Sequence, residues 1–179
     1  MIEYSCLKHK GNAEVYSDEV YISIIPHLTI AILYGSEMGE KAGNASLILG
    51  DLVSGDEIPF DELTELAEIH LPDEAQYLIL RVEGDFINIR KKGKLFSMIM
   101  KDGQMKELPN GVFGLAAGDR IVCGTENFYK YLTSEGILAD CLVSSDCEEW
   151  KDLVTRRISD KTELLCGNLS AVFLMPHEL

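Results

Sequence analysis

The order of strand-like and helical segments constrains the fold of this chain most. Short segments rich in β-branched and aromatic residues recur along it and are typical of strands. They cover residues 19–25, 28–34, 77–82, 86–90, 95–100, 119–123 and 170–175. Between them, apolar residues recur at helical spacing. The predicted helices cover residues 42–53, 60–67, 126–132 and 148–158.

Turn dipeptides divide the middle of the chain. Gly84-Asp85, Lys92-Gly93, Asp102-Gly103 and Asn110-Gly111 separate short strands as hairpin turns do. We therefore expect residues 76–123 to form an antiparallel meander. The whole order is α+β, because it lacks the regular strand-helix alternation of a parallel sheet. A sheet packed on a second sheet, with helices outside, is consistent with this order of segments.

The composition predicts one globular domain over residues 1–179. Hydrophobic residues make up 46% of the chain and charged residues 26%, as in ordinary folded proteins. The 15 Gly and 5 Pro are spread without a linker-like cluster. A chain of this length is therefore expected to fold around a single core.

The charge of the chain excludes several classes of partner. With 16 Lys and Arg against 30 Asp and Glu, the formal net charge is −14. Such a chain repels nucleic acid and anionic membrane surfaces. Its dense basic run, Arg90 to Lys94, adjoins a predicted hairpin and is interpreted as solvated turn residues rather than an anion site. The longest apolar segment, 21–34, is interrupted and too short to cross a bilayer.

The first residues of the sequence and the cysteines favour a cytoplasmic protein. Glu3 and Lys8 stand where a signal peptide needs an apolar stretch, so no export is predicted. The 5 cysteines contain no CxxC pair, and reduced thiols in a cytoplasm are the simplest interpretation. Cys123 and Cys166 lie in apolar runs and are expected to be buried thiols without a catalytic role.

Motifs with a known catalytic mechanism are missing from the sequence. There is no GxxxxGK[ST] phosphate loop, no GxGxxG turn after a strand, no GxSxG nucleophile elbow and no HExxH. The 4 histidines are far apart and are not spaced as metal ligands. No catalytic residue is therefore assigned from motifs.

Five segments, taken in order, carry a family resemblance. Residues 31–46, AILYGSEMGEKAGNAS, follow the pattern AVADGMGGHxAGExAS, and residues 17–22, SDEVYI, follow NEDSYF. Residues 86–108 correspond to two central hairpins, residues 118–132, GDRIVCGTENFYKYL, to GDxLLLxTDGLxxxL, and residues 167–174, GNLSAVFL, to DNITAVVV. The chain thus resembles metal-dependent protein phosphatases of type 2C, including their small bacterial members. The resemblance implies an α-β-β-α sandwich, in which two packed antiparallel β-sheets are flanked by helices.

The resemblance also implies a metal centre. In the family, aspartates hold two divalent cations that bind substrate phosphate and activate a bridging water. Carried over by position, the first-strand aspartate falls on Glu19, the bridging aspartate on Tyr34, the TDG aspartate on Glu126 and the terminal aspartate on Gly167. A neutral phenol cannot bridge two cations, and glycine has no side-chain oxygen. Glu19 and Glu126 are thus predicted to be relic metal ligands. No cofactor is expected, with Mn or Mg as the ion if the protein is active.

Each of these positions also has a simpler interpretation. Glu19 is then an exposed acid at a strand end, and Glu126 an acid at a helix start, where the macrodipole favours it. Tyr34 packs its ring over the cleft where the ions would have been, or lies on the surface. Gly35 is expected to supply a backbone angle that other residues avoid.

We therefore predict a pseudophosphatase, a catalytically impaired or inactive protein of type 2C fold. It would act as a protein-binding regulatory module in bacterial-type signalling, with a phosphoprotein as one possible partner. The alternative is an active serine/threonine phosphatase with a rearranged cation site that recruits Glu37, Asp18 or Asp160. A second alternative is an unrelated α+β interaction domain.

Overall fold

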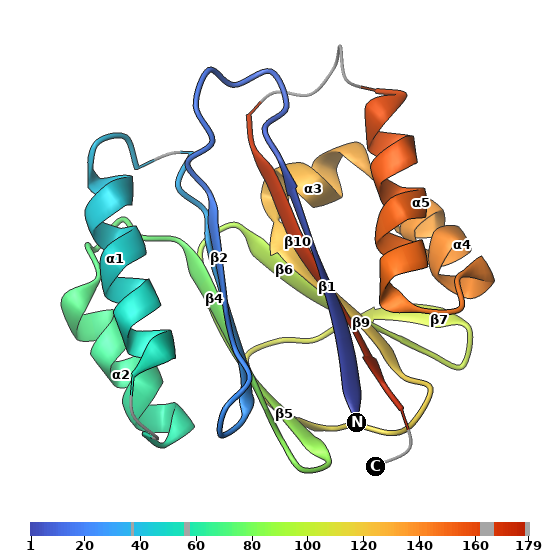
Figure 1. Cartoon of the computed structure of the whole chain (residues 1–179), viewed down its shortest axis with the longest axis horizontal. Coiled ribbons are helices and arrows are strands. Elements are labelled where there is room, and N and C mark those ends of the chain that lie inside the picture. Colours follow the sequence, from blue (N-terminus) through green and yellow to red (C-terminus); the bar gives the residue numbers. More distant parts are fainter. Residues whose placement is uncertain (37, 56–57, 162–166, 178–179) are drawn as a thin grey trace. The chain divides into compact units, whose positions relative to one another are not determined.

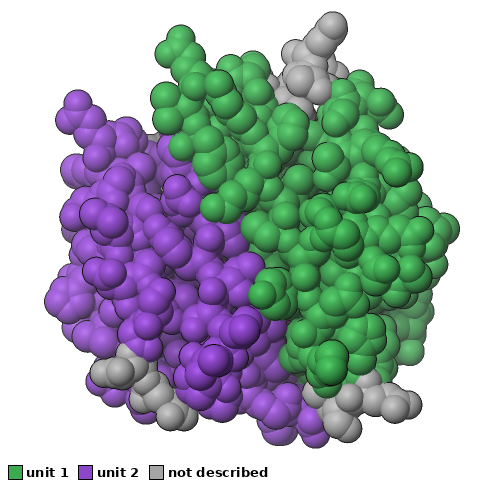
Figure 2. Space-filling model, viewed as in Figure 1, with its two compact units in different colours: residues 1–16, 96–109, 115–179 green, residues 17–95, 110–114 purple. Residues whose placement is uncertain are grey.

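Two antiparallel five-stranded sheets with their helices build the protein (Figure 1). The computed structural model describes residues 1–36, 38–55, 58–161 and 167–177. The chain divides into two compact units, coloured in Figure 2. Unit 1 comprises residues 1–16, 96–109 and 115–179, and unit 2 comprises residues 17–95 and 110–114.

Unit 2 is built on a sheet with the strand order β2-β3-β4-β5-β8. Its strands are β2 (Glu19–Ser23), β3 (Leu28–Leu33), β4 (Tyr77–Glu83), β5 (Phe86–Lys92) and β8 (Gly111–Gly114). Two helices, α1 (Lys41–Ser54) and α2 (Phe60–His70), lie side by side on this sheet (Figure 1).

Alternate residues of the central strands form the core between this sheet and its helices. Residues two apart in a strand point to the same face, and Leu33, Tyr77 and Ile79 meet Leu49 and Leu63 in one buried cluster. All five side chains are fully buried. The periodicity that predicts these strands and helices therefore also places their apolar faces together.

The sheet of unit 1 has the order β1-β10-β9-β6-β7. Its strands are β1 (Ile2–His9), β10 (Leu169–Pro176), β9 (Arg120–Thr125), β6 (Leu95–Lys101) and β7 (Gln104–Glu107). Its helices are α3 (Glu126–Tyr131), α4 (Ser134–Val143) and α5 (Cys147–Ser159). Trp150 of α5 is fully buried, with its ring centroid 4.9 Å from that of Phe173 on β10. Edge-to-face contacts of this kind add to the burial of apolar area.

The predicted fold class is confirmed: the chain is α+β, with two antiparallel sheets flanked by helices. All four predicted helices are present within about two or three residues of their expected ends. The sequence analysis missed β1 and α4 and gave no ranges for the short strands β7 and β8. Glu3 and Lys8 obscure the strand pattern of β1, yet all eight of its residues pair with β10.

The predicted meander over residues 76–123 is wrong in part. Gly84-Asp85 and Asp102-Gly103 are two-residue hairpin turns, since Glu83 pairs with Phe86 and Lys101 with Gln104. Lys92-Gly93 and Asn110-Gly111 instead join strands of different sheets. A turn signal marks where the chain bends but carries no information on which strand the next segment pairs with.

The basic run is likewise not a turn, because Arg90, Lys91 and Lys92 belong to β5. In the described part of the chain, no helix has the length and apolar character needed to cross a membrane.

The described cysteines yield a prediction on thiol reactivity. None of Cys6, Cys123, Cys141 and Cys147 forms a disulfide, and the last three are buried; Cys166 lies outside the described residues. Burial raises the pKa of Cys141 to about 11 and the pKa of Cys147 to about 12. The thiolate is the reactive form, so we expect iodoacetamide to leave Cys123, Cys141 and Cys147 unmodified in the native protein at mildly alkaline pH.

Mass spectrometry of tryptic peptides measures this pattern. The same reaction in denaturant should label all of these thiols and serves as the control. Native labelling of Cys147 as fast as in denaturant would contradict the packing of α5.

Candidate functional site

In unit 2 the chain places Glu19 and Tyr34 at the same end of the β2–β3 hairpin. Glu19 begins β2 and pairs with Leu33, the last residue of β3, and Tyr34 follows directly. Tyr34 is only 4% exposed, and its backbone N–H donates to the Gln76 carbonyl at 2.9 Å. Glu19 is half-buried. The position that the resemblance gives to a bridging aspartate is therefore filled by a buried aromatic ring, and the surface interpretation of Tyr34 is wrong.

The carboxylate of Asp18 holds the turn that follows Tyr34. Its Oδ1 accepts hydrogen bonds from the Gly35 backbone N–H at 3.1 Å and from the Ser36 hydroxyl at 3.2 Å. Asp18 is fully buried. Charged acceptors strengthen such bonds, and burial of a carboxylate is tolerable only with donors of this kind.

Gly35 is required by a close approach of two backbone segments. A Cβ at Gly35 would lie 1.8 Å from the carbonyl oxygen of Ser17, so no larger residue fits. Its φ is not in the left-handed region. The expectation that Gly35 supplies an unusual backbone angle is therefore wrong, and the physical reason for glycine is its close approach to the Ser17 carbonyl, just before β2.

In unit 1 the chain places Glu126 and Gly167 in neighbouring segments. Glu126 is the exposed first residue of α3, and the side chain of the next residue, Asn127, donates to the Asn168 carbonyl at 3.0 Å. An exposed acid at a helix start is what the simpler interpretation of Glu126 expects. The two carried-over positions of unit 1 thus lie on segments joined by a buried hydrogen bond.

Gly167 differs from an aspartate in more than its side chain. Its φ is 84°, a conformation that residues with a Cβ rarely adopt. Its backbone N–H donates to Asn12 Oδ1 at 3.1 Å. The backbone here is set for glycine, so an aspartate at this position would be strained.

Asn168, which the sequence analysis did not single out, fixes the loop between β1 and β2. Its side-chain amide donates to the carbonyls of Lys10 at 3.1 Å and Val15 at 3.2 Å. The residue is almost fully buried. A polar residue directly before the apolar run of β10 is the only signal in the sequence, and it does not reveal the distant partners.

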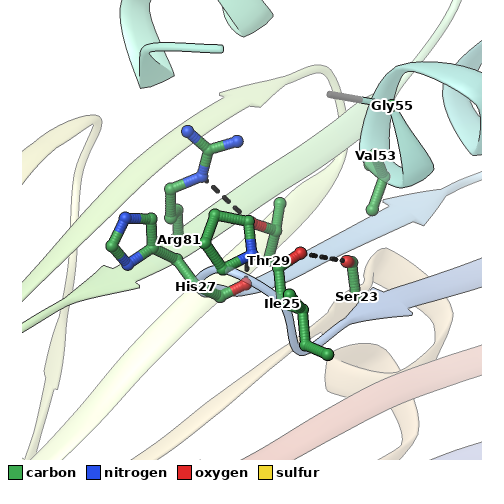
Figure 3. A pocket seen from close by; sticks show the side chains of 8 residues that line it. Ser23, Ile25, His27, Thr29, Val53, Gly55 and Arg81 are labelled. Atoms are coloured by element: carbon green, nitrogen blue, oxygen red, sulfur yellow. Dashed lines mark hydrogen bonds between the residues drawn. The ribbon is translucent and has the colours of Figure 1, made fainter. Parts of the chain in front are cut away.

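The other end of the β2–β3 hairpin has a small cavity beside Arg81 (Figure 3). Arg81 Nε donates to Thr29 Oγ1 at 3.0 Å, and Arg81 Nη1 donates to the Ile58 carbonyl at 2.6 Å. The volume of about 10 Å³ accommodates about one water molecule. Arg81 therefore serves to tie the segment before α2 to the sheet.

Comparison with known proteins bears on the fold. No family model and no curated protein matches the sequence. Among solved structures, the photosystem II phosphatase PBCP matches with a TM-score of 0.80 and 11% identity, covering 100% of both chains. The serine/threonine phosphatase PstP/Ppp of Mycobacterium tuberculosis matches with a TM-score of 0.78 and 12% identity, covering 99% of each chain.

The chain has the fold of the type 2C protein phosphatases. A second structure of PstP, of its catalytic domain in complex with two manganese ions, matches at a TM-score of 0.75, with 13% identity over 99% of each chain. PppA, a key regulatory component of the type VI secretion system in Pseudomonas aeruginosa, matches at 0.75, with 10% identity over 97% of each chain. The second alternative, an α+β domain with an unrelated fold, is therefore wrong, because these likenesses cover nearly the whole chain.

The type 2C fold is thus present with altered residues at the carried-over positions. Within the described residues, no group of three or more His, Cys, Asp and Glu side chains is arranged to hold a metal ion. Asp160, one of the alternative ligands, is the exposed C-cap of α5. Glu37, another, lies outside the described residues.

The Asp18 contacts yield a prediction on stability. Replacing Asp18 by Ala leaves the buried Gly35 N–H without its acceptor, which costs about 1–3 kcal/mol of unfolding free energy. Asp18→Asn keeps an acceptor oxygen and should cost about 1 kcal/mol or less. Urea unfolding monitored by circular dichroism measures both. Equal losses for the two variants would show that the hydrogen bonds to Gly35 and Ser36 do not stabilise the turn.

Proposed function

We propose that this protein is a pseudophosphatase, a type 2C fold that has lost its metal chemistry and works by binding a protein. The observation that carries the proposal is the burial of Tyr34, at 4% exposure, where the resemblance puts the bridging aspartate. A neutral phenol offers one weak oxygen ligand, whereas Mn²⁺ and Mg²⁺ prefer carboxylates and water.

The residues at the carried-over positions do not fit a pair of cations. Tyr34 and Gly167 contribute no carboxylate, and the glycine backbone at φ 84° disfavours an aspartate in its place. Glu19 and Glu126 remain as the two relic acids that we propose once belonged to the metal site. Two carboxylates on separate segments are fewer than a binuclear centre needs.

The alternative of an active phosphatase with a rearranged site receives less support. Asp18, one replacement ligand it would need, directs Oδ1 at the turn donors Gly35 and Ser36. Recruiting Asp18 for a cation would therefore compete with contacts that the turn uses.

A protein partner follows from the same reasoning. A type 2C fold that keeps its two cores but lacks metal-dependent hydrolysis still has surfaces that can bind another protein. PppA, a regulatory component, matches this fold. A phosphoprotein is one candidate partner. We further propose a cytoplasmic location, where the thiols of the described cysteines stay reduced.

An activity assay tests the proposal directly. With Mn²⁺ or Mg²⁺ present, we expect no turnover of a phosphoserine peptide or an aryl phosphate above a protein-free blank. The reason is that no pair of cations activates a water for attack on phosphorus.

Clear turnover that disappears in Glu19→Ala or Glu126→Ala would overturn the proposal, since it would show that these acids hold working ions. Asp160→Ala is the control for the rearranged site: turnover lost only in that variant would favour the alternative ligand set.

A further inference from the structure

Helix α4 of unit 1, which lies beside α5 (Figure 1), is apolar on more than its buried face. Ile137 and Cys141 of α4 are buried in the core of the unit. A helix on the surface of a globular protein usually carries polar residues on the face opposite the core. In α4 that outer face instead carries Ala139, Leu142 and Val143, all of which are exposed.

The outer face of α4 is a continuous apolar stripe. Residues three and four apart in a helix are neighbours, and this spacing joins Leu138 and Ala139 to Leu142 and Val143. Leu142 is 57% exposed and Val143 is 70% exposed, whereas Leu138 is half-buried at the edge of the core. Adjacent aliphatic side chains with this exposure are typical of an interaction surface.

The N-terminal end of the outer face carries an acid. Glu135 precedes Leu138 by three residues and Ala139 by four, so it belongs to the same face. It is exposed, and within the described part of the chain it forms no ion pair. Glu135 is therefore available to a cation from outside the chain.

The C-terminal end of α4 carries a cation. Arg120, which is half-buried, donates from Nη1 to the carbonyls of Cys141 and Ser144, the latter at 2.8 Å. A guanidinium has five N–H donors, and the hydrogen bonds of Arg120 all start from this one nitrogen. Arg120 thus keeps donors for an acceptor that comes from outside.

A hollow of about 240 Å³ adjoins Arg120 at this end of the helix, and Ser145, just past α4, also lines it. The other ionisable side chains that line the hollow already have partners: Asp119 pairs with Lys101, and His177 with Glu3. Within the described residues, Arg120 is the cation of this hollow that has no acidic partner.

The outer face of α4 is therefore complementary to itself. When two copies meet about a twofold axis perpendicular to α4, their helices run antiparallel and each contact occurs twice. The start of one helix then lies at the end of the other, which brings Glu135 of each copy to Arg120 of the other copy. Antiparallel helices also place opposite ends of their macrodipoles together.

We propose that the outer face of α4 binds a second copy of this chain, as an antiparallel pair of α4 helices. Leu142 and Val143 cover Leu138 of the other copy, and the small Ala139 allows close approach at the axis. One short helix from each copy makes a small interface, so the dimer is weak, with a dissociation constant in the micromolar range.

This inference goes beyond the proposed function and uses none of the positions carried over from the phosphatases. Its failure therefore leaves the activity assay unaffected. Sedimentation velocity of the full chain tests it: we expect a monomer in dilute solution and a dimer as the concentration rises through the micromolar range. A chain that stays monomeric up to about 1 mM would overturn the proposal.

A matched pair of variants locates the contact. Leu142→Glu should weaken the dimer at least about tenfold, because it puts a charge into the apolar contact. Leu47→Glu, at a 69% exposed residue of α1, should leave the affinity unchanged. Both side chains are exposed, so circular dichroism should show that both variants are folded. Equal dimer affinity of the two variants would place the contact elsewhere and overturn the proposal.

A second pair tests the charge match. Glu135→Lys should also weaken the dimer, because it puts a like charge against Arg120 of the other copy. Glu14→Lys, at an exposed acid of the loop between β1 and β2, changes the net charge equally and should not. Equal dimer affinity of these two variants would contradict the antiparallel arrangement and overturn the proposal.

Ala139→Cys tests the position of the axis. Helices packed about 8–10 Å apart bring residues at their crossing point within the Cα separation of about 4–7 Å that a disulfide spans. Mild oxidation at a concentration where the dimer forms should link two copies of this variant, seen by non-reducing gel electrophoresis. Leu47→Cys and the wild-type chain are the controls. Linkage of Ala139→Cys no faster than that of Leu47→Cys would overturn the proposal.

Discussion

The buried carboxylate of Asp18 is the interaction on which the candidate site in unit 2 depends. It accepts from Gly35 and Ser36 and so fixes the chain just after Tyr34. Because Gly35 approaches the Ser17 carbonyl too closely for any side chain, the turn has one arrangement. The resemblance to the phosphatases makes Asp18 a candidate metal ligand, but in this structure its carboxylate holds the turn.

The cores of the two units explain what stabilises the fold apart from the candidate site. The cluster around Trp150 and Phe173 and the cluster around Tyr77 and Leu49 are made of apolar side chains from sheets and helices. Burial of such side chains supplies most of the folding free energy. Substitutions at Tyr34 and Gly167 therefore change the site without removing what stabilises the sheets.

The sequence predicts the elements better than their partners. Helical periodicity finds α1, α2, α3 and α5, because it depends on residues close together in the sequence. The order of the segments along the chain identifies the fold class. The pairing of β6 with β7 and β9, instead of with β5, depends on contacts between distant segments. No local turn signal carries that information.

The site shows the same division. Alignment by position assigns two of the family's aspartates to Tyr34 and Gly167, but it does not reveal the burial of Tyr34 or the positive φ of Gly167. The role of Asn168 was missed because its partners, Lys10 and Val15, are more than 150 residues away. The sequence pattern thus predicts the loss of two carboxylate ligands, and the structure adds the burial of Tyr34 and the backbone conformation of Gly167.

Titration of the protein with Mn²⁺ in a calorimeter tests the central claim most directly, because it needs no substrate and no assumption about the partner. The account predicts no heat of binding in the submillimolar range for the wild-type chain. Submillimolar binding of two ions that is lost in both Glu19→Ala and Glu126→Ala would contradict it, since those acids would then be working ligands and not relics.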